Sequence, residues 1–184
     1  MSRTDPTPPT HFRPGIYAAT HPERAAVITS SGSVVTFAEI EERSCRLAQA
    51  LFAHGLRPGD HVAVLLPNDH RTHEVAFGLQ RSGLYFTMVN THLAAEEAAY
   101  IVVDCGARTL ITSSALAPLA TELMALTPAV ELRLMVGDRA EEGHELYDDF
   151  VSGFPGEPLT AEVEGSPMLY SSGTTGHPRG SAGR

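Results

Sequence analysis

The sequence contains no lysine, because all 13 of its basic residues are arginine. A Walker loop requires a lysine and then a serine or threonine directly after the second glycine of its G-x-x-x-x-G pattern. The chain therefore cannot be a nucleoside-triphosphate hydrolase of the Walker type. Any phosphate-binding cation must be an arginine, whose planar guanidinium favours bidentate contacts, whereas an ammonium acts as a point charge.

Basic residues are also few, and the net charge of −9 argues against nucleic acid as a partner. The only cysteines, Cys45 and Cys105, lie too far apart for a metal or redox motif, and we expect both to be small buried apolar residues. The longest apolar run, near "VAVLLP", is too short to cross a bilayer. The opening "MSRTDPTPPTHFRPG" has neither the basic start nor the apolar run of a signal peptide. These absences predict a cytoplasmic protein with reduced thiols.

What is present is typical of one globular domain: 184 residues, of which 42% are hydrophobic and 19% charged. Residues 1–13 are polar and rich in proline, so we expect a flexible N-terminal tail. Residues 14–184 form the expected domain.

Within residues 14–184, helical and strand patterns alternate. A short helix beginning near Gly15 is followed by two strand-like runs around a Gly-containing loop, which predicts a hairpin. Expected helices then cover 36–54, 72–83, 94–107, 115–127 and 144–153, and expected strands cover 61–66, 84–90, 108–112, 130–137 and 166–172. Because the strands are apolar on both faces, we predict an α/β fold with a mostly parallel sheet and helices on both faces.

Local signals fix several helix ends. Thr36 and Glu39 match a capping box, and Gly55 follows the last turn of that helix, where a left-handed residue is wanted. Ser114 is expected to cap the helix over 115–127, with Pro118 in its first turn. The segment 155–167 is expected to be a surface connector, and 166–172 to be the final strand.

One segment carries a recognisable chemistry. The run "MLYSSGTTGHPRG", residues 168–180, follows a predicted strand and therefore lies at the carboxyl edge of a parallel sheet, where such sheets bind ligands. Glycines let backbone N–H groups turn toward one anion, and hydroxyls and a guanidinium add further donors. The pattern favours a polyphosphate site over a flexible Gly/Ser linker. Its members are Ser171, Ser172, Gly173, Thr174, Thr175, Gly176 and Arg179.

The run "LYSSGTTGHPRG" resembles the phosphate-binding signature of the adenylate-forming superfamily, with Arg179 in the usual lysine position. That superfamily comprises acyl-CoA synthetases, luciferases and the adenylation domains of peptide synthetases. The resemblance covers about residues 14–181, and "RSGLYFTMVNTHL" is most similar to acyl-CoA synthetases acting on fatty or related acids. The implied fold is an incomplete N-terminal subdomain of the adenylate-forming fold.

The resemblance implies a two-step reaction. A carboxylate attacks the α-phosphorus of ATP to give an acyl-adenylate, and the thiol of coenzyme A then displaces AMP. By position, Ser172, Thr174 and Thr175 are expected to donate hydroxyls to phosphate, Gly173 and Gly176 to let the backbone approach, and Arg179 to pair with phosphate oxygens. Mg²⁺ is expected to accompany ATP. The family's metal-binding glutamate belongs to a later motif, so we expect no metal ligand and no catalytic residue in this chain.

The adenine-binding, ribose-binding and C-terminal lysine motifs of the family have no match here. We therefore expect the chain to be an N-terminal portion, cut just after the phosphate-binding loop and inactive alone. The alternatives are a fragment of a peptide-synthetase adenylation domain and a non-catalytic remnant that binds only phosphate or partners.

Other chemistry-bearing residues have simpler interpretations. His70 and His73, followed by Glu74, are spaced i, i+3 and do not match HExxH, so a solvated helix face is favoured over a metal site. His177 lies at the variable position of the signature. Tyr85, Phe86 and Met88 are expected to be strand-core residues and not a substrate pocket. Paired acids are expected to be exposed helix charges: Glu96–Glu97, Glu141–Glu142 and Asp148–Asp149.

Overall fold

The computed structural model describes residues 14–30, 32–68, 70–171 and 179–182. The predicted tail, residues 1–13, and most of the predicted phosphate loop, residues 172–178, lie outside the described residues. The helices are α1 (Pro14–Thr20), α2 (Phe37–His54), α3 (His70–Arg81), α4 (Ala95–Asp104), the short 3₁₀ turn η1 (Ser114–Leu116), α5 (Ala117–Leu126) and α6 (Tyr147–Ser152). The strands are β1 (Ala25–Ile28), β2 (Val34–Thr36), β3 (His61–Val64), β4 (Tyr85–Met88), β5 (Ala107–Ser113), β6 (Leu132–Val136), β7 (Glu145–Leu146), β8 (Ser166–Ser171) and β9 (Arg179–Ala182).

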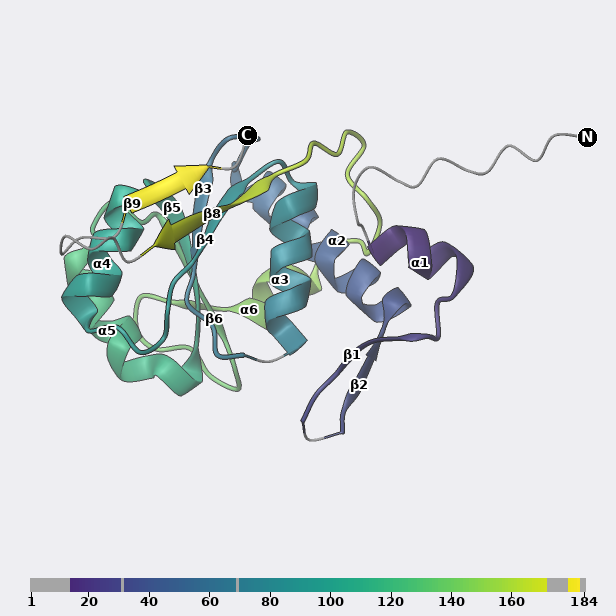
Figure 1. Cartoon of the computed structure of the whole chain (residues 1–184), viewed down its shortest axis with the longest axis horizontal. Helices are drawn as coiled ribbons and strands as arrows, with labels where there is room; N and C mark the ends of the chain where they lie inside the picture. The colour runs from purple at the N-terminus through teal and green to yellow at the C-terminus, as the bar shows by residue number, and fades with distance from the viewer. Residues whose placement is uncertain (1–13, 31, 69, 172–178, 183–184) are drawn as a thin grey trace, which may run out of the picture.

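A seven-stranded sheet forms the centre of the molecule, in the order β7-β6-β5-β3-β4-β8-β9 (Figure 1). Every neighbouring pair is parallel except β8 and β9, which are antiparallel. The predicted α/β fold with a mostly parallel sheet is confirmed. The strand predicted over 166–172 is confirmed as β8, but the expectation that it is the last strand is wrong, because the antiparallel strand β9 follows it.

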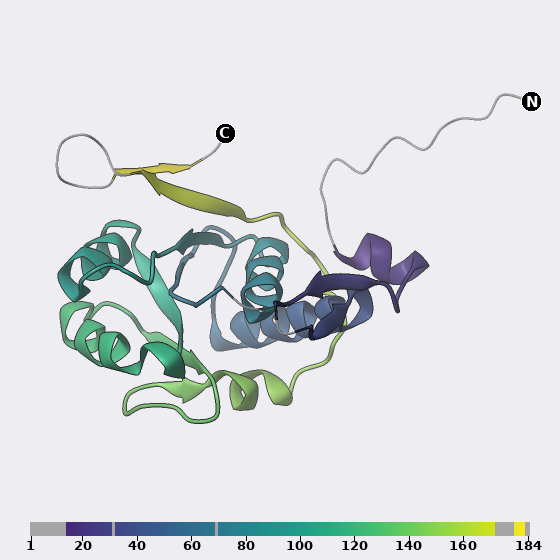
Figure 2. The same cartoon turned by 60° about the horizontal axis from the view of Figure 1, so that its bottom comes forward.

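Helices cover both faces of this sheet, as the apolar strand pattern predicts (Figure 2). Side chains alternate along β3 and the residue after it. Val62 and Val64 join the core cluster that contains residues of α2, α3 and α6, whereas Ala63 and Leu65 join the cluster built on α4 and α5. The period of two therefore gives one strand two buried faces, which is the condition for a parallel sheet in the middle of a domain.

A smaller unit stands beside the sheet. The strands β1 and β2 pair antiparallel as the predicted hairpin, with a register irregularity between Ala25 and Val27. Helix α1 packs on α2, where the Tyr17 and Phe37 rings stack with centroids 5.0 Å apart. Figure 1 shows this unit projecting away from the sheet at the N-terminal end of α2.

The predicted capping box at the start of α2 is confirmed. The backbone N–H of Glu39 donates to Oγ1 of Thr36 at 3.2 Å, and the backbone N–H of Thr36 donates to Oε2 of Glu39 at 2.8 Å. That second bond holds the pKa of Glu39 below its ordinary value. Gly55 adopts φ 107°, the left-handed conformation expected at the end of α2.

Removing this cap is expected to have a modest cost. Replacing Thr36 by alanine should lower the free energy of unfolding by about 1 kcal/mol, because one N–H of the first turn loses its acceptor. The matched control is Thr121→Ala, since exposed Thr121 bonds only back to the Ala117 carbonyl of its own helix at 2.9 Å. Denaturant unfolding of both variants measures the difference, and an equal midpoint for the two would contradict the capping assignment.

Three further expectations need correction. Ser113, not Ser114, acts as the cap: its side chain accepts the backbone N–H of Ala115 at 3.2 Å, and Ser114 begins a 3₁₀ turn before α5. The helix predicted over 144–153 is shorter than expected, because residues 145–146 pair with β6 as strand β7 and α6 begins only at Tyr147. Tyr85 and Met88 are 36% and 41% exposed, so only Phe86 of the predicted β4 core set is buried.

Both cysteines are buried and free, as expected for small apolar residues. Burial raises the pKa of the Cys45 thiol to about 12 and also raises that of Cys105. Within the described part of the chain, no helix has the length and apolar content needed to cross a membrane.

Candidate functional site

The predicted phosphate loop is held at both ends by the β8–β9 pair. Strand β8 ends at Ser171, β9 begins at Arg179, and these two residues are Cα partners in the antiparallel ladder. The chain therefore leaves the sheet and returns to it at one point. The roles predicted for Ser172, Gly173, Thr174, Thr175 and Gly176 fall on residues outside the described set and stay predictions. The same holds for the side chains of Ser171 and Arg179.

This point lies at the carboxyl edge of the parallel strands. Strand β8 pairs in parallel with β4, with Tyr85 opposite Ser166 and Thr87 opposite Met168. The segments that follow β4 and β5 begin at the same edge. The Asn90 side chain accepts the backbone N–H of His92 at 2.9 Å, and Ser113 caps η1 there. Open parallel sheets bind ligands at this edge, and Ser171 and Arg179, the two ends of the predicted loop, lie there.

One face of β8 is firmly packed. Met168 and Tyr170 contact the apolar cluster under α4 and α5. The Tyr170 hydroxyl donates to Oδ2 of Asp104 on α4 at 2.8 Å. Partial burial, followed by this bond to a carboxylate, raises the pKa of Tyr170 well above its ordinary value. The strand that leads into the loop is therefore tied to a helix as well as to β4.

The opposite face of β8 is open. Leu169 is 66% exposed, and Met88, at the end of neighbouring β4, is 41% exposed. Apolar side chains on an interior strand are normally covered. Met88 was assigned to the core because it is apolar, and this was wrong because its face of the sheet is exposed at that point.

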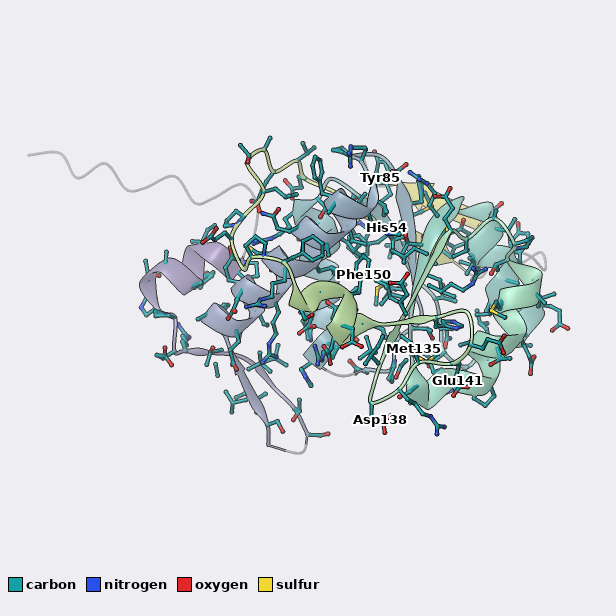
Figure 3. All side chains as sticks on the ribbon, turned by 180° about the vertical axis from the view of Figure 1, so that it is seen from behind. His54, Tyr85, Met135, Asp138, Glu141 and Phe150 are labelled. Atoms are coloured by element: carbon teal, nitrogen blue, oxygen red, sulfur yellow. The ribbon has the colours of Figure 1, made fainter. Side chains whose placement is uncertain are left out.

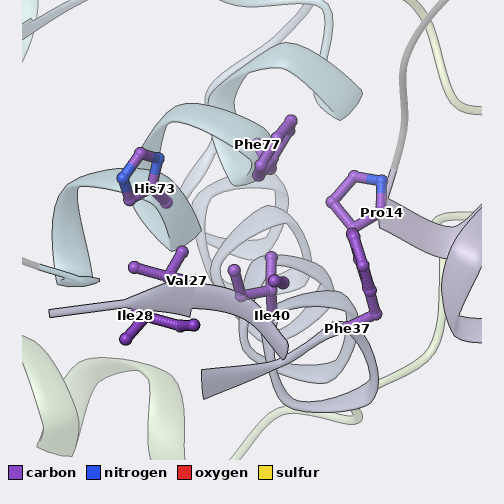
Figure 4. A pocket seen from close by; sticks show the side chains of 8 residues that line it. Pro14, Val27, Ile28, Phe37, Ile40, His73 and Phe77 are labelled. Atoms are coloured by element: carbon purple, nitrogen blue, oxygen red, sulfur yellow. The ribbon is translucent and has the colours of Figure 1, made fainter. Parts of the chain in front are cut away.

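Two cavities among the described residues lie away from Ser171 and Arg179. An apolar pocket of about 350 Å³ lies between the β1–β2 hairpin and helices α2 and α3, and Figure 4 shows its lining side chains, with His73 as the polar member. A polar pocket of about 420 Å³ lies between α2, α3 and α6 and includes His70. Its arginines are paired with carboxylates, as in the 2.9 Å contacts of Arg71 with Glu74 and Asp148.

His70, His73 and the paired acids lie on pocket walls or on the surface. His70 is half-buried and His73 is exposed, and both line pocket walls; each of the paired acids is exposed or half-exposed. Glu97 also caps the start of α4 by accepting the backbone N–H of Ala94 at 3.0 Å. Among the residues that the structure describes, no group of three histidine, cysteine or acidic side chains is arranged to hold a metal ion.

The sequence did not reveal two residues that fix the position of the segment just before β8. Arg81 at the end of α3 is 3% exposed, and its guanidinium contacts carboxylates from two other segments. The backbone of Gly165, just before β8, packs against Leu84. Figure 3 shows how densely side chains fill the region between the sheet and its helices. No periodic or motif signal marks either residue, because both matter only through neighbours distant in sequence.

The fold and the site together define a class: a mostly parallel α/β protein whose last parallel strand delivers a glycine- and hydroxyl-rich segment to the carboxyl edge of the sheet. A model of the AMP-binding enzyme family matches residues 16–182. The chain belongs to this family, which confirms the resemblance drawn from "LYSSGTTGHPRG".

Curated relatives carry ligase and synthase names. The fatty acid–[acyl-carrier-protein] ligase ScoC of Streptomyces coeruleorubidus is 31% identical over 167 residues, which span 89% of this chain and 31% of ScoC. A feruloyl-CoA synthase of Amycolatopsis sp. is 32% identical over 156 residues, 85% of this chain and 29% of that protein. The chain thus spans about a third of the length of the curated relatives it matches.

Solved structures agree. The anthranilate CoA ligase AuaEII, in complex with anthranoyl-AMP, superposes with a TM-score of 0.80 at 26% identity, covering 95% of this chain and 35% of that one. The likeness confirms that the chain has the fold of part of an adenylate-forming ligase.

Proposed function

We propose that this chain is the phosphate-binding portion of an AMP-forming acid–thiol ligase. The ligase activates a carboxylic acid, most simply a fatty acid, as its acyl-adenylate and transfers the acyl group to coenzyme A. The observation that carries the proposal is the position of residues 171–179, closed by the Ser171–Arg179 pair at the carboxyl edge of the sheet.

The donor set of this segment fits a polyphosphate. When a carboxylate attacks the α-phosphorus of ATP, negative charge grows on the departing pyrophosphate, so fixed donors around its oxygens lower the barrier. Ser172, Thr174 and Thr175 bring hydroxyls, Gly173 and Gly176 allow backbone N–H groups to approach, and Arg179 brings a charge that stays on at every physiological pH. Mg²⁺ would accompany ATP and would neutralise part of the phosphate charge.

The thiol acceptor has two candidates. Coenzyme A is the first, because relatives include CoA synthases. The thiol of an acyl-carrier protein is the second, because ScoC is named for that acceptor. A peptide-synthetase adenylation domain, which also delivers to a carrier protein, falls under this second candidate. We assign the protein to the cytoplasm, which suits its two free thiols.

The test is binding, because the chain alone is expected to be inactive. Titration calorimetry with Mg²⁺-pyrophosphate and with Mg²⁺-ATP should show saturable binding. Replacing both Thr174 and Thr175 by alanine, or Arg179 by methionine, should weaken it at least tenfold, since bonds to charged groups contribute about 1.5–3 kcal/mol each. The Thr121→Ala variant serves as control. Equal affinity of the Thr174/Thr175 variant and the control would overturn the assignment.

A further inference from the structure

We propose that Arg81 is a positioning residue. It holds the connector between α6 and β8, residues 153–165, and so fixes the register of β8 and the place where the phosphate loop leaves the sheet. The ligand in this inference rests on the proposed function, whereas the structural part does not.

The chain enters β8 without a short turn to guide it. Strand β7 lies at one edge of the sheet, and β8 lies on the other side of β6, β5, β3 and β4. Figure 2 shows the connector leaving α6, crossing α2 and reaching β8 on the far side. In hairpins the turn sets strand register, but a long irregular connection leaves register to other contacts.

Those contacts come from α2 and the end of α3. The Gln49 side chain donates to the carbonyls of Glu157 and Pro158 at 3.0 and 3.2 Å. Nearer to β8, the side chain of Gln80 donates to Oε1 of Glu164 at 3.1 Å, and its carbonyl accepts the backbone N–H of Gly165 at 2.6 Å. The connector is therefore held at both of its ends.

Arg81 joins three segments at the centre of this arrangement. Its guanidinium donates to Oε2 of Glu41 on α2 at 2.6 Å and lies 3.5 Å from Oε1 of Glu162 on the connector. It also contacts Sγ of Cys45. Next to Arg81, Ser82 forms a parallel bridge with Val163. The cluster thus holds residues 162 and 163 against the end of α3.

The burial of Arg81 makes its contact with Glu162 favour one register of β8. Arg81 is 3% exposed, so its charge has little access to water and depends on carboxylate partners. A shift of the connector by one residue would move Glu162 away from the guanidinium and leave only the Glu41 carboxylate of these two partners, so the buried charge would be less well compensated. The same shift would exchange the two faces of β8. Met168 and Tyr170 would then point away from the apolar cluster that they now pack against. Arg81 therefore favours one register.

The position of Glu162 determines the position of the phosphate loop through the short strand β8. Glu162 precedes Ser166, the first residue of β8, by four residues, and Ser166 pairs with Tyr85. The strand then runs without interruption to Ser171, the partner of Arg179. Fixing Glu162 thus fixes both ends of the proposed phosphate loop.

The experiment compares Arg81→Met, Arg81→Lys and a matched control, Arg46→Met, whose guanidinium pairs with Glu42 of its own helix at 2.7 Å. Hydrogen exchange of β8 amides is measured against β3 amides, and Mg²⁺-pyrophosphate affinity is measured in parallel. We expect Arg81→Met to speed exchange in β8 about tenfold with β3 little changed, and to weaken pyrophosphate binding about tenfold. Arg81→Lys should restore part of both, and Arg46→Met should change neither.

A purely structural role would produce a different result. Equal acceleration of exchange in β3 and β8, or unchanged exchange in β8, would overturn the inference. If Arg81→Met does not fold, Glu162→Gln decides, because it removes the connector's charge while keeping its shape; the same β8-specific acceleration is expected. Failure of the wild-type chain to bind pyrophosphate would count against the proposed function, and the exchange measurement would still decide the role of Arg81.

Discussion

Replacing Gly165 by alanine is expected to lower the free energy of unfolding by about 3 kcal/mol, at the upper end of the usual cost of overpacking. A Cβ on Gly165 would lie 2.7 Å from the Leu84 nitrogen and 3.0 Å from the Leu79 carbonyl oxygen, and closer still to the Leu84 carbonyl oxygen. These are backbone atoms, which cannot rotate away as side chains do. The start of β8 would have to move away from β4.

The control for this variant is Gly153→Ala. A Cβ on Gly153 meets no described atom within 4 Å, and its φ of −83° suits alanine. We expect that variant to unfold at the wild-type denaturant concentration or slightly above it. Denaturant titration followed by circular dichroism measures both. A Gly165→Ala chain as stable as the Gly153→Ala chain would show that β8 does not approach Leu84 as closely as described.

Replacing Gly78 by leucine should be comparably damaging, again by about 3 kcal/mol. Gly78 lies inside α3, where glycine is itself unfavourable by about 1 kcal/mol relative to alanine. Its position is explained by α2: a Cβ there would lie 3.1 Å from Cβ of Leu47 and 3.1 Å from the Ser44 carbonyl oxygen. A leucine side chain would therefore force α2 and α3 apart and open the core cluster that contains Leu47.

The control places the same side chain on an exposed helix surface, as Ala53→Leu in α2. That variant should change stability by less than about 0.5 kcal/mol. A double variant, Gly78→Leu with Leu47→Ala, should lose less than the sum of its single losses, because each change makes room for the other. Strict additivity in urea unfolding would contradict the close contact between the two helices.

Local rules predicted much of the fold. The capping box of Thr36 and Glu39, the left-handed Gly55 and the alternation of apolar strands with amphipathic helices depend on neighbours in sequence, and all are confirmed. The strand β9 was missed because the short run "RGSA" lacks β-branched and aromatic residues and pairs only because β8 lies beside it. The exposure of Met88 was missed because apolarity does not reveal which part of a strand a helix covers.

The residues of the candidate site also fall into two groups, those that a local motif predicted and those that only distant contacts reveal. The phosphate-binding role proposed for residues 171–179 came from a motif, and the structure adds that Ser171 and Arg179 pair at the two ends of the segment. The residues that support it, Arg81 and Gly165, act through contacts across the chain. A single arginine at a helix end, or a glycine in a polar connector, has many interpretations in sequence, so these roles required coordinates.

The pairing of β8 with β4 also bears on the order in which the molecule assembles. Tyr85 meets Ser166 roughly 80 residues later, so this ladder closes a far longer loop than the one between neighbouring β3 and β4. Chain entropy must be lost before such distant contacts contribute, which makes them late events in folding. A partly folded chain would then already contain β3–β6 while β8 is still unpaired, so the phosphate binding that we propose would report completion of the whole sheet.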